Sequence, residues 1–278
     1  MKAYLYRIDC LTNLHVGSGE ENYSIVDKEV IRDSVTDEPI IPASGVKGAI
    51  RSYFQENSML TREEKLKIFG QEVKTGSANN DIIPGAYRFL SAYLIARPLR
   101  ISTKNGTFIR TSSAALVNHL LRLIQDFNIE ILGKTSLQPI MERSGIYSTR
   151  SRIKIEGDEI TDIPTDNERE QIIREFELLK SLTGDDDVAL ANPLNRYSLP
   201  VIARNQLDDG VSNNLWYEQY VPHQSVFYFV VLAPKDSVNT AFDEILDGSV
   251  IQFGGNASVG YGYCKVTKVG ESHEQTKN

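Results

Sequence analysis

The chain has 278 residues, of which 41% are hydrophobic and 24% are charged, a balance typical of globular proteins. Its net charge of −7 disfavours a generic nucleic-acid binder, although a local basic face can bind RNA in an acidic protein. No apolar run is long enough to span a membrane, and the first residues lack the pattern of a signal peptide.

Two cysteines, Cys10 and Cys264, lie on apolar, strand-like segments. We expect both to be buried free thiols, because two cysteines in a chain of this length do not make a disulfide framework. Together with the missing signal peptide, this predicts a cytoplasmic protein with no membrane partner.

The first elements in chain order are a strand, a glycine-bearing loop and a helix. Residues 1–13 alternate in polarity and predict a strand, and residues 14–22 predict a loop. Ser44 stands at a helix-capping position, and a short amphipathic helix is expected over 60–70. The apolar face of the first helix is formed by Val46, Ala49, Ile50, Tyr53 and Phe54.

The middle of the chain begins with a polar stretch, about 71–84, that predicts a flexible loop. Residues 85–101 predict strands, followed by a hairpin return. Ser112 or Ser113 caps the next predicted helix. Its apolar face is formed by Leu116, Leu120, Leu121 and Ile124.

The last part of the chain contains a strong helical pattern over 168–182, a hairpin-like excursion from 194 and a short helix over 239–246. A glycine-rich loop and a strand over 261–269 follow. Elements alternate without a long parallel βαβ series, and the first and last strands can pair in one antiparallel sheet. This pattern indicates an α+β fold.

Two glycine-rich segments, HVGSG (15–19) and GGNASVGYG (254–262), stand near opposite ends of the chain. The first lacks the Gly-Lys-Ser/Thr of a P-loop, and the second precedes a strand and does not open a helix, which disfavours a dinucleotide fold. Each segment is either a tight turn or a backbone that phosphates can approach closely.

Lys47 and Arg51 lie one helical turn apart after Ser44, in a helix thinned by Gly45 and Gly48. The simplest interpretation is a solvated helix face. The alternative is a positively polarised helix start that, with two cations, binds a polyanionic backbone.

Three carboxylates and one histidine near this helix are candidates for chemistry. Asp27 is either a solvated loop charge or a catalyst that binds a metal or activates a ribose 2′-hydroxyl, with Glu29 and Asp33 as alternatives. Arg32 beside Asp33 suggests a structural ion pair. His15 either makes a structural hydrogen bond or contacts RNA. No Cys/His zinc pattern is present in the sequence.

Cations and aromatic residues are interleaved around 194–205, where Arg196, Tyr197, Arg204 and Asn205 are expected on a hairpin with an acidic tip at 208–210. Such a hairpin can wedge between stacked bases and hold the flanking phosphates.

The chain resembles the RAMP superfamily of CRISPR-associated proteins, and within it the repeated backbone subunit of the type III-B effector, the Cmr complex. The N-terminal likeness lies in HVGSG, IVDKEVIRD (25–33) and PIIPASGVKGAIR (39–51). It continues in 84–108, SSAALVNHLL (112–121), 215–232 and FGGNASVGYGY (253–263). It covers most of the chain, and its motifs are specific in combination.

The resemblance implies a ferredoxin-like (RRM-like) palm with a β-hairpin thumb and helical insertions. It implies binding of a CRISPR guide RNA, other copies of the chain and other effector subunits. Complementary single-stranded RNA would be cut at regular intervals with a divalent metal ion, Mg²⁺ or Mn²⁺. The cleaving aspartate maps onto Asp27, a possible metal ligand. The RNA-binding set we expect is His15, Gly17, Ser18, Ser44, Lys47, Arg51, Arg196, Arg204, Gly254, Gly255 and Asn256.

We expect one domain over 1–278. Its palm comprises about 1–58, 85–128 and 220–270, its thumb hairpin about 194–220, and its flexible loop about 71–84. Three alternatives remain open on sequence: a non-catalytic guide-binding filament subunit, the type III-A backbone subunit, and a small-molecule enzyme with a phosphate site.

Overall fold

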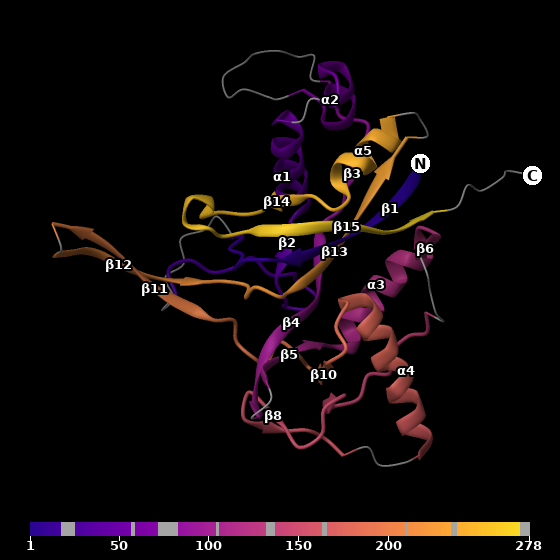
Figure 1. The fold of residues 1–278 in the computed structure, drawn as a ribbon, viewed down its shortest axis with the longest axis vertical. Helices are drawn as coiled ribbons and strands as arrows, with labels where there is room; N and C mark the ends of the chain where they lie inside the picture. The colour runs from indigo at the N-terminus through magenta and orange to yellow at the C-terminus, as the bar shows by residue number, and fades with distance from the viewer. Residues whose placement is uncertain are drawn as a thin grey trace, which may run out of the picture.

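The fold is centred on an antiparallel sheet, here in a computed structural model. Residues described are 1–17, 26–56, 59–71, 83–103, 106–131, 137–162, 166–209, 211–234 and 238–272. Four strands run side by side in the order β15 (Tyr263–Ser272), β1 (Lys2–Cys10), β13 (Val226–Ala233) and β4 (Ala92–Thr103), each antiparallel to its neighbour. The first and last strands therefore pair, as their patterns predicted (Figure 1).

Helices α1 (Ala43–Glu56), α2 (Arg62–Phe69) and α5 (Val238–Leu246) share one aromatic core with the sheet. The ring of Phe242 lies 5.1 Å from that of Phe54 and 6.5 Å from that of Tyr6 on β1. These helices gather at one end of the molecule in Figure 1, and burial of their aromatic side chains stabilises the fold there.

The chain between β4 and β13 adds strands and two helices at the other end of the molecule (Figure 1). The sheet continues from β4 to β5 (Gly106–Ser112), β10 (Val188–Asn192) and β7 (Gly145–Ser148), and β10 runs parallel to β5. The added helices are α3 (Ala114–Asp126) and α4 (Asp166–Thr183).

The short strands attach to these longer ones. They are β2 (Ile40–Ile41), β3 (Arg88–Phe89), β6 (Ile129–Ile131), β8 (Lys154–Ile155), β9 (Asp158–Glu159) and β14 (Val250–Gln252). A 3₁₀ turn, η1, covers Ala257–Val259. The mixed α/β fold with a large, mostly antiparallel sheet agrees with the α+β prediction.

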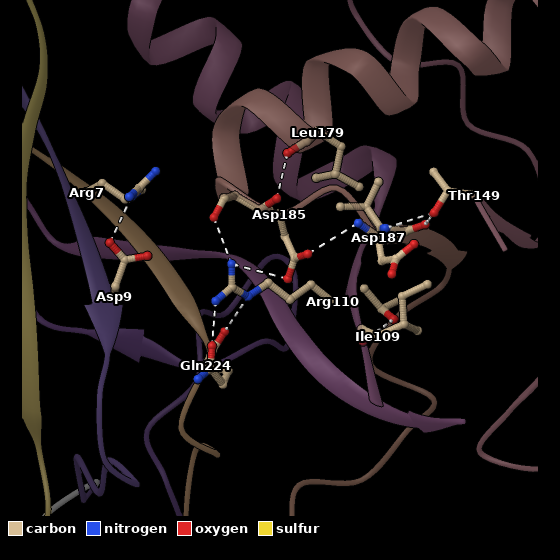
Figure 2. Close-up of polar contacts among 12 residues, drawn as sticks. Arg7, Asp9, Ile109, Arg110, Thr149, Leu179, Asp185, Asp187 and Gln224 are labelled. Carbon is tan, nitrogen blue, oxygen red and sulfur yellow. Dashed lines mark hydrogen bonds and ion pairs between the residues drawn. The ribbon is translucent and has the colours of Figure 1, made fainter. Parts of the chain in front are cut away.

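Arg110 on β5 ties the added elements to the central sheet (Figure 2). Its guanidinium donates to the Thr183 carbonyl at the end of α4 (2.9 Å) and to the backbone and side-chain oxygens of Gln224 (3.1 and 2.6 Å). Asp185 lies 3.6 Å away. One partly buried cation thus joins three segments distant in sequence, which positions the turn that leads into β13.

The hairpin of β11 (Val201–Asp208) and β12 (Val211–Gln219) forms a separate two-stranded sheet that projects from the body (Figure 1). It lies within the expected range of 194–220. Arg196 and Tyr197 were expected on it but precede it, because the chain there is held elsewhere: Arg196 pairs with Asp158, and the Tyr197 hydroxyl donates to the same carboxylate (2.8 Å).

Helix boundaries depart from prediction at one important place. Ser44 was expected to cap α1, but the helix begins at Ala43, whose amide donates to the Ser91 hydroxyl (3.1 Å). Ser113 caps α3 as expected, accepting from the Leu116 amide.

Cys10 and Cys264 are buried free thiols on paired strands, as predicted. Most of the expected flexible loop, 72–82, lies outside the described residues.

No helix in the described part of the chain is long and apolar enough to cross a membrane.

Candidate functional site

A buried carboxylate, Glu218, joins the hairpin base to both glycine-rich segments. Its side chain is 1% exposed. It accepts hydrogen bonds from Arg204 Nε, across the hairpin, and from Asn256 Nδ2 (2.9 Å). His15 Nε2 lies 3.9 Å from its Oε1. Burial alone would raise the pKa of Glu218, but the hydrogen bonds from Asn256 and Arg204, together with nearby His15, hold it below its usual value.

The C-terminal glycine loop lies directly against the first loop. Gly254 has a φ of 74°, and a Cβ there would lie 2.3 Å from the His15 carbonyl oxygen, so only glycine fits. The Gly255 amide donates to that carbonyl (2.8 Å). Gln252 braces the loop by donating to the Phe253 and Gly254 carbonyls (both 3.1 Å). The two segments therefore build one surface, as their sequences suggested.

His15 supports this surface from inside. Its side chain is 8% exposed, and its Nδ1 donates to the Gln219 carbonyl (2.7 Å). Both ring nitrogens thus face protein groups, which supports the structural role, and RNA contact by His15 stays a prediction. Gly17 bridges to Val30 on the neighbouring segment, while Ser18 lies outside the described residues.

Asp27 is exposed and attached to the hairpin. Its backbone amide donates to the Tyr217 carbonyl (3.1 Å), and its Oδ2 accepts from the Tyr217 amide (2.7 Å). The Gln219 amide donates to the Lys28 carbonyl (2.9 Å), so the segment lies along the outer edge of β12. The carboxylate is thus held in place and open to solvent.

The alternatives to Asp27 have other surroundings. Asp33 caps a turn: its Oδ1 accepts from the Val35 amide (3.1 Å) and from the Thr36 amide and hydroxyl (2.9 and 3.0 Å). The suggested ion pair with Arg32 is not formed, because Arg32 donates to the Asp37 carbonyl (2.6 Å). Asp33 is therefore structural.

A buried ion pair fixes the chain on both sides of this site. Arg97 on β4 donates to Glu38 (3.3 Å) and to the Leu194 carbonyl (3.2 Å). Burial raises the pKa of Glu38, and the charge of Arg97 opposes that rise. The loop that follows Asp27 and the chain that enters the hairpin thus share one anchor.

The predicted cations lie in three places. Lys47 and Arg51 lie along α1 with the exposed Ser44, and α1 packs against β14, which leads into the glycine loop. Arg204 stacks on Tyr261 of that loop (4.8 Å), and its Nη2 has no hydrogen-bond partner in the described part of the protein. Arg196 is remote from both, paired with Asp158.

A family model of the RAMP superfamily matches residues 7–265. The chain belongs to the RAMP superfamily. It is 27% identical to "CRISPR system Cmr endoribonuclease Cmr4" of Pyrococcus furiosus, over 96% of each chain. Against "CRISPR system Cms endoribonuclease Csm3" of Enterococcus italicus it is 37% identical, over 24% of this chain and 37% of that protein.

Among solved structures, this RAMP protein matches the crystal structure of oligomeric Cmr4 from Pyrococcus furiosus with a TM-score of 0.70. The identity is 22%, and the match covers 97% of this chain and 99% of that one. This match supports the mixed α/β fold. The recognition made from sequence motifs is confirmed.

Four residues of the candidate site were not predicted from the sequence: Trp216, Tyr217, Glu218 and Tyr261. One signal was available for Glu218, which is the acidic residue in the aromatic-rich run LWYEQY (215–220). A charge at alternating spacing with Trp216 indicates a shared strand face. Its partners Arg204, Asn256 and His15 come from the other hairpin strand and from both glycine-rich segments, so only the fold identifies them.

Replacing Glu218 by Gln should destabilise the protein at pH 7 by about 2 kcal/mol, because hydrogen bonds to charged groups contribute roughly that much. Glu218 has a lowered pKa in the folded state. Its stabilising contribution is therefore complete above the unfolded pKa of about 4.3 and is lost as the pH falls through the folded pKa.

Urea unfolding of both proteins between neutral and acidic pH measures this difference. It should vanish in acid, while Glu177→Gln on the surface of α4 should change little. A difference that does not vary with pH would contradict the role given to the Glu218 charge.

Proposed function

We propose that this RAMP protein is a backbone subunit of a type III CRISPR effector, which binds guide RNA and cuts complementary RNA. The observation that carries the proposal is the exposed Asp27 carboxylate held at the base of a projecting hairpin. It occurs in a chain similar over nearly its whole length to an endoribonuclease. Other copies of the chain and other effector subunits are its partners, and the role places it in the cytoplasm.

The strand order supports a ferredoxin-like, RRM-like palm. In chain order, β1, α1, β4, β13, α5 and β15 follow a β-α-β-β-α-β series. Their spatial order, β15-β1-β13-β4, places the last strand beside the first and the third beside the second. The remaining elements are insertions, and β11–β12 is the thumb.

The guide-binding surface in this proposal combines α1 with the glycine loop. Ser44, Lys47 and Arg51 supply a polar and cationic row, and phosphates can approach the backbone of the exposed Gly254 and Gly255. Arg204 adds a cation from the thumb. Arg196 lies outside this surface, and so it has no part in the proposal.

The target-binding side is the thumb with Asp27. Val211 and Leu215 on the hairpin are 70% and 54% exposed, as suits side chains that separate stacked bases. Asp27 accepts the proton of a ribose 2′-hydroxyl, whose oxygen then attacks the adjacent phosphorus. The bond to the 5′-oxygen breaks and that oxygen takes a proton from water, leaving a 2′,3′-cyclic phosphate and a 5′-hydroxyl. Alignment of the attacking oxygen accounts for much of the acceleration.

A divalent metal ion, Mg²⁺ or Mn²⁺, fits Asp27 as a single ligand. In the described ranges no three His, Cys, Asp or Glu side chains are placed to hold a metal. Magnesium is commonly bound by one or two carboxylates together with substrate phosphates, which Asp27 and RNA would supply. When bound, the metal would neutralise charge on the scissile phosphate.

The alternatives differ in support. A type III-A subunit is less favoured because the likeness to Csm3 covers about a quarter of the chain, whereas the likeness to Cmr4 covers 96%. A non-catalytic filament subunit would bind the same RNAs without using Asp27, and the next experiment separates it.

Asp27→Asn should reduce cutting of complementary RNA by about 100-fold or more, the usual scale for losing a general base. Asparagine keeps an oxygen for the Tyr217 amide, so the segment should remain docked and guide and target binding should not change. Glu29→Gln is the matched control and should cut normally. Cutting by Asp27→Asn at the wild-type rate would leave the non-catalytic filament subunit as the function.

Chelation of divalent ions by EDTA should stop cutting by the assembled complex while leaving guide binding intact, because Lys47 and Arg51 bind phosphate without a metal. Gel electrophoresis of labelled target and guide, before and after adding back Mg²⁺ or Mn²⁺, measures both. Undiminished cutting in EDTA would remove the metal from the proposal.

Lys47→Met and Arg51→Met should each weaken guide binding for every guide sequence. Each should also reduce the slope of log K against log salt concentration by about 0.7, the value per phosphate contact in single strands. Filter binding over a salt series measures it, with Lys154→Met, on a distant exposed lysine, as control. A loss restricted to certain guide sequences would contradict backbone recognition.

A further inference from the structure

Asp27 is attached to the thumb. Asp27 and Lys28 lie along β12, and the Val30 amide still donates to the Gln219 side chain (3.3 Å), whereas the Ile31 amide donates to the Val16 carbonyl of the palm loop (2.8 Å). The attachment changes from thumb to palm at Val30, which also bridges to Gly17. The carboxylate proposed to cut RNA therefore follows the hairpin that is proposed to separate the bases.

Backbone and side-chain contacts together hold the Asp27 segment on β12. The amides of Asp27 and Lys28 share one acceptor, the Tyr217 carbonyl, at 3.1 and 3.2 Å, so these two bonds do not by themselves select a register. The register is set by the Lys28 carbonyl, which accepts from the Gln219 amide (2.9 Å), and by Asp27 Oδ2, which accepts from the Tyr217 amide (2.7 Å).

The Lys28 side chain adds a further contact to this register. Lys28 Nζ lies 5.3 Å from the centre of the Trp216 ring, within the range of a cation–π interaction. Trp216 pairs across the hairpin with Arg204 and shares a strand face with Glu218. Lys28 thus contacts the face of the thumb on which the buried Glu218 lies.

We propose that Lys28 and Trp216 form a positioning clamp, defined as this cation–π pair, that keeps Asp27 in register with the thumb. The clamp rests on the proposed function of Asp27. The clamp makes the position of the cut depend on the thumb, because the same hairpin separates the bases and holds the Asp27 carboxylate. Lys28 and Trp216 position Asp27 and are not catalytic residues.

Lys28→Met and Trp216→Leu in the assembled complex test the clamp. Each should slow single-turnover cutting at saturating target by about 2- to 5-fold, the scale of an exposed cation–π interaction. The dissociation constant for target should not change. Lys28→Arg and Trp216→Phe keep the interaction and should restore the rate, and Lys154→Met is the matched control.

The double variant Lys28→Met/Trp216→Leu should lose no more than the larger single loss, because both changes remove one contact. Sequencing of target fragments should also show cuts displaced by one nucleotide in the two single variants. Additive losses, or an equal loss in Lys154→Met, would overturn the clamp, as would unchanged rates and cut positions.

Fluorescence gives a readout that does not depend on cutting. Trp216 is the only tryptophan in the chain, so its emission reports the contact with Lys28 directly. Lys28→Met should change the emission of the protein and Lys154→Met should not. Loss of cutting in Asp27→Asn with normal cutting in Lys28→Met would reject the clamp alone. Normal cutting in Asp27→Asn would reject the proposed function first.

Discussion

The site depends on one buried charge, Glu218, and its three neighbours. Arg204 reaches it from the other hairpin strand, Asn256 from the C-terminal glycine loop, and His15 from the first loop. A buried carboxylate without partners is costly, so each partner is held in place by the need to compensate the charge. The thumb is thereby fixed to the palm surface on which guide RNA is proposed to lie. Because the thumb is fixed in this way, the proposed guide-binding and target-binding surfaces lie on different sides of its base.

The proposed function needs one surface for guide RNA and one for target RNA, and the two surfaces proposed for them are built differently. The surface around α1 and the glycine loop is backbone-rich and rigid: Gly254 meets the His15 carbonyl too closely for any side chain. The surface around Asp27 is a short segment on the edge of β12, held by Tyr217 and by Lys28 on Trp216. A rigid platform suits a permanently bound guide, while an exposed carboxylate on a projecting hairpin suits a target that arrives and leaves.

Much of the fold could be predicted from local pattern. The α3 apolar face and its Ser113 cap are both observed, and so is the pairing of the first and last strands. Predictions failed where a residue distant in sequence supplied a hydrogen bond or ion pair that local pattern had not indicated. Ser44 does not cap α1 because Ser91 accepts the first amide, and Arg196 is not on the thumb because Asp158 holds it. His15 lies inside the surface, beside Gln219 and Glu218, which no local pattern predicted.

By itself, the sequence determined the family, the helices with strong periodicity and the two glycine segments, since these depend on residue type at short spacing. It singled out Asp27 only through family resemblance, because a lone loop carboxylate carries no local signal. The tertiary structure decided which groups meet. Glu218 and Asn256, 38 residues apart, meet His15 from near the other end of the chain, and Asp27 is attached to β12 by backbone and side-chain hydrogen bonds. Such contacts follow from register and topology, which no short stretch of sequence encodes.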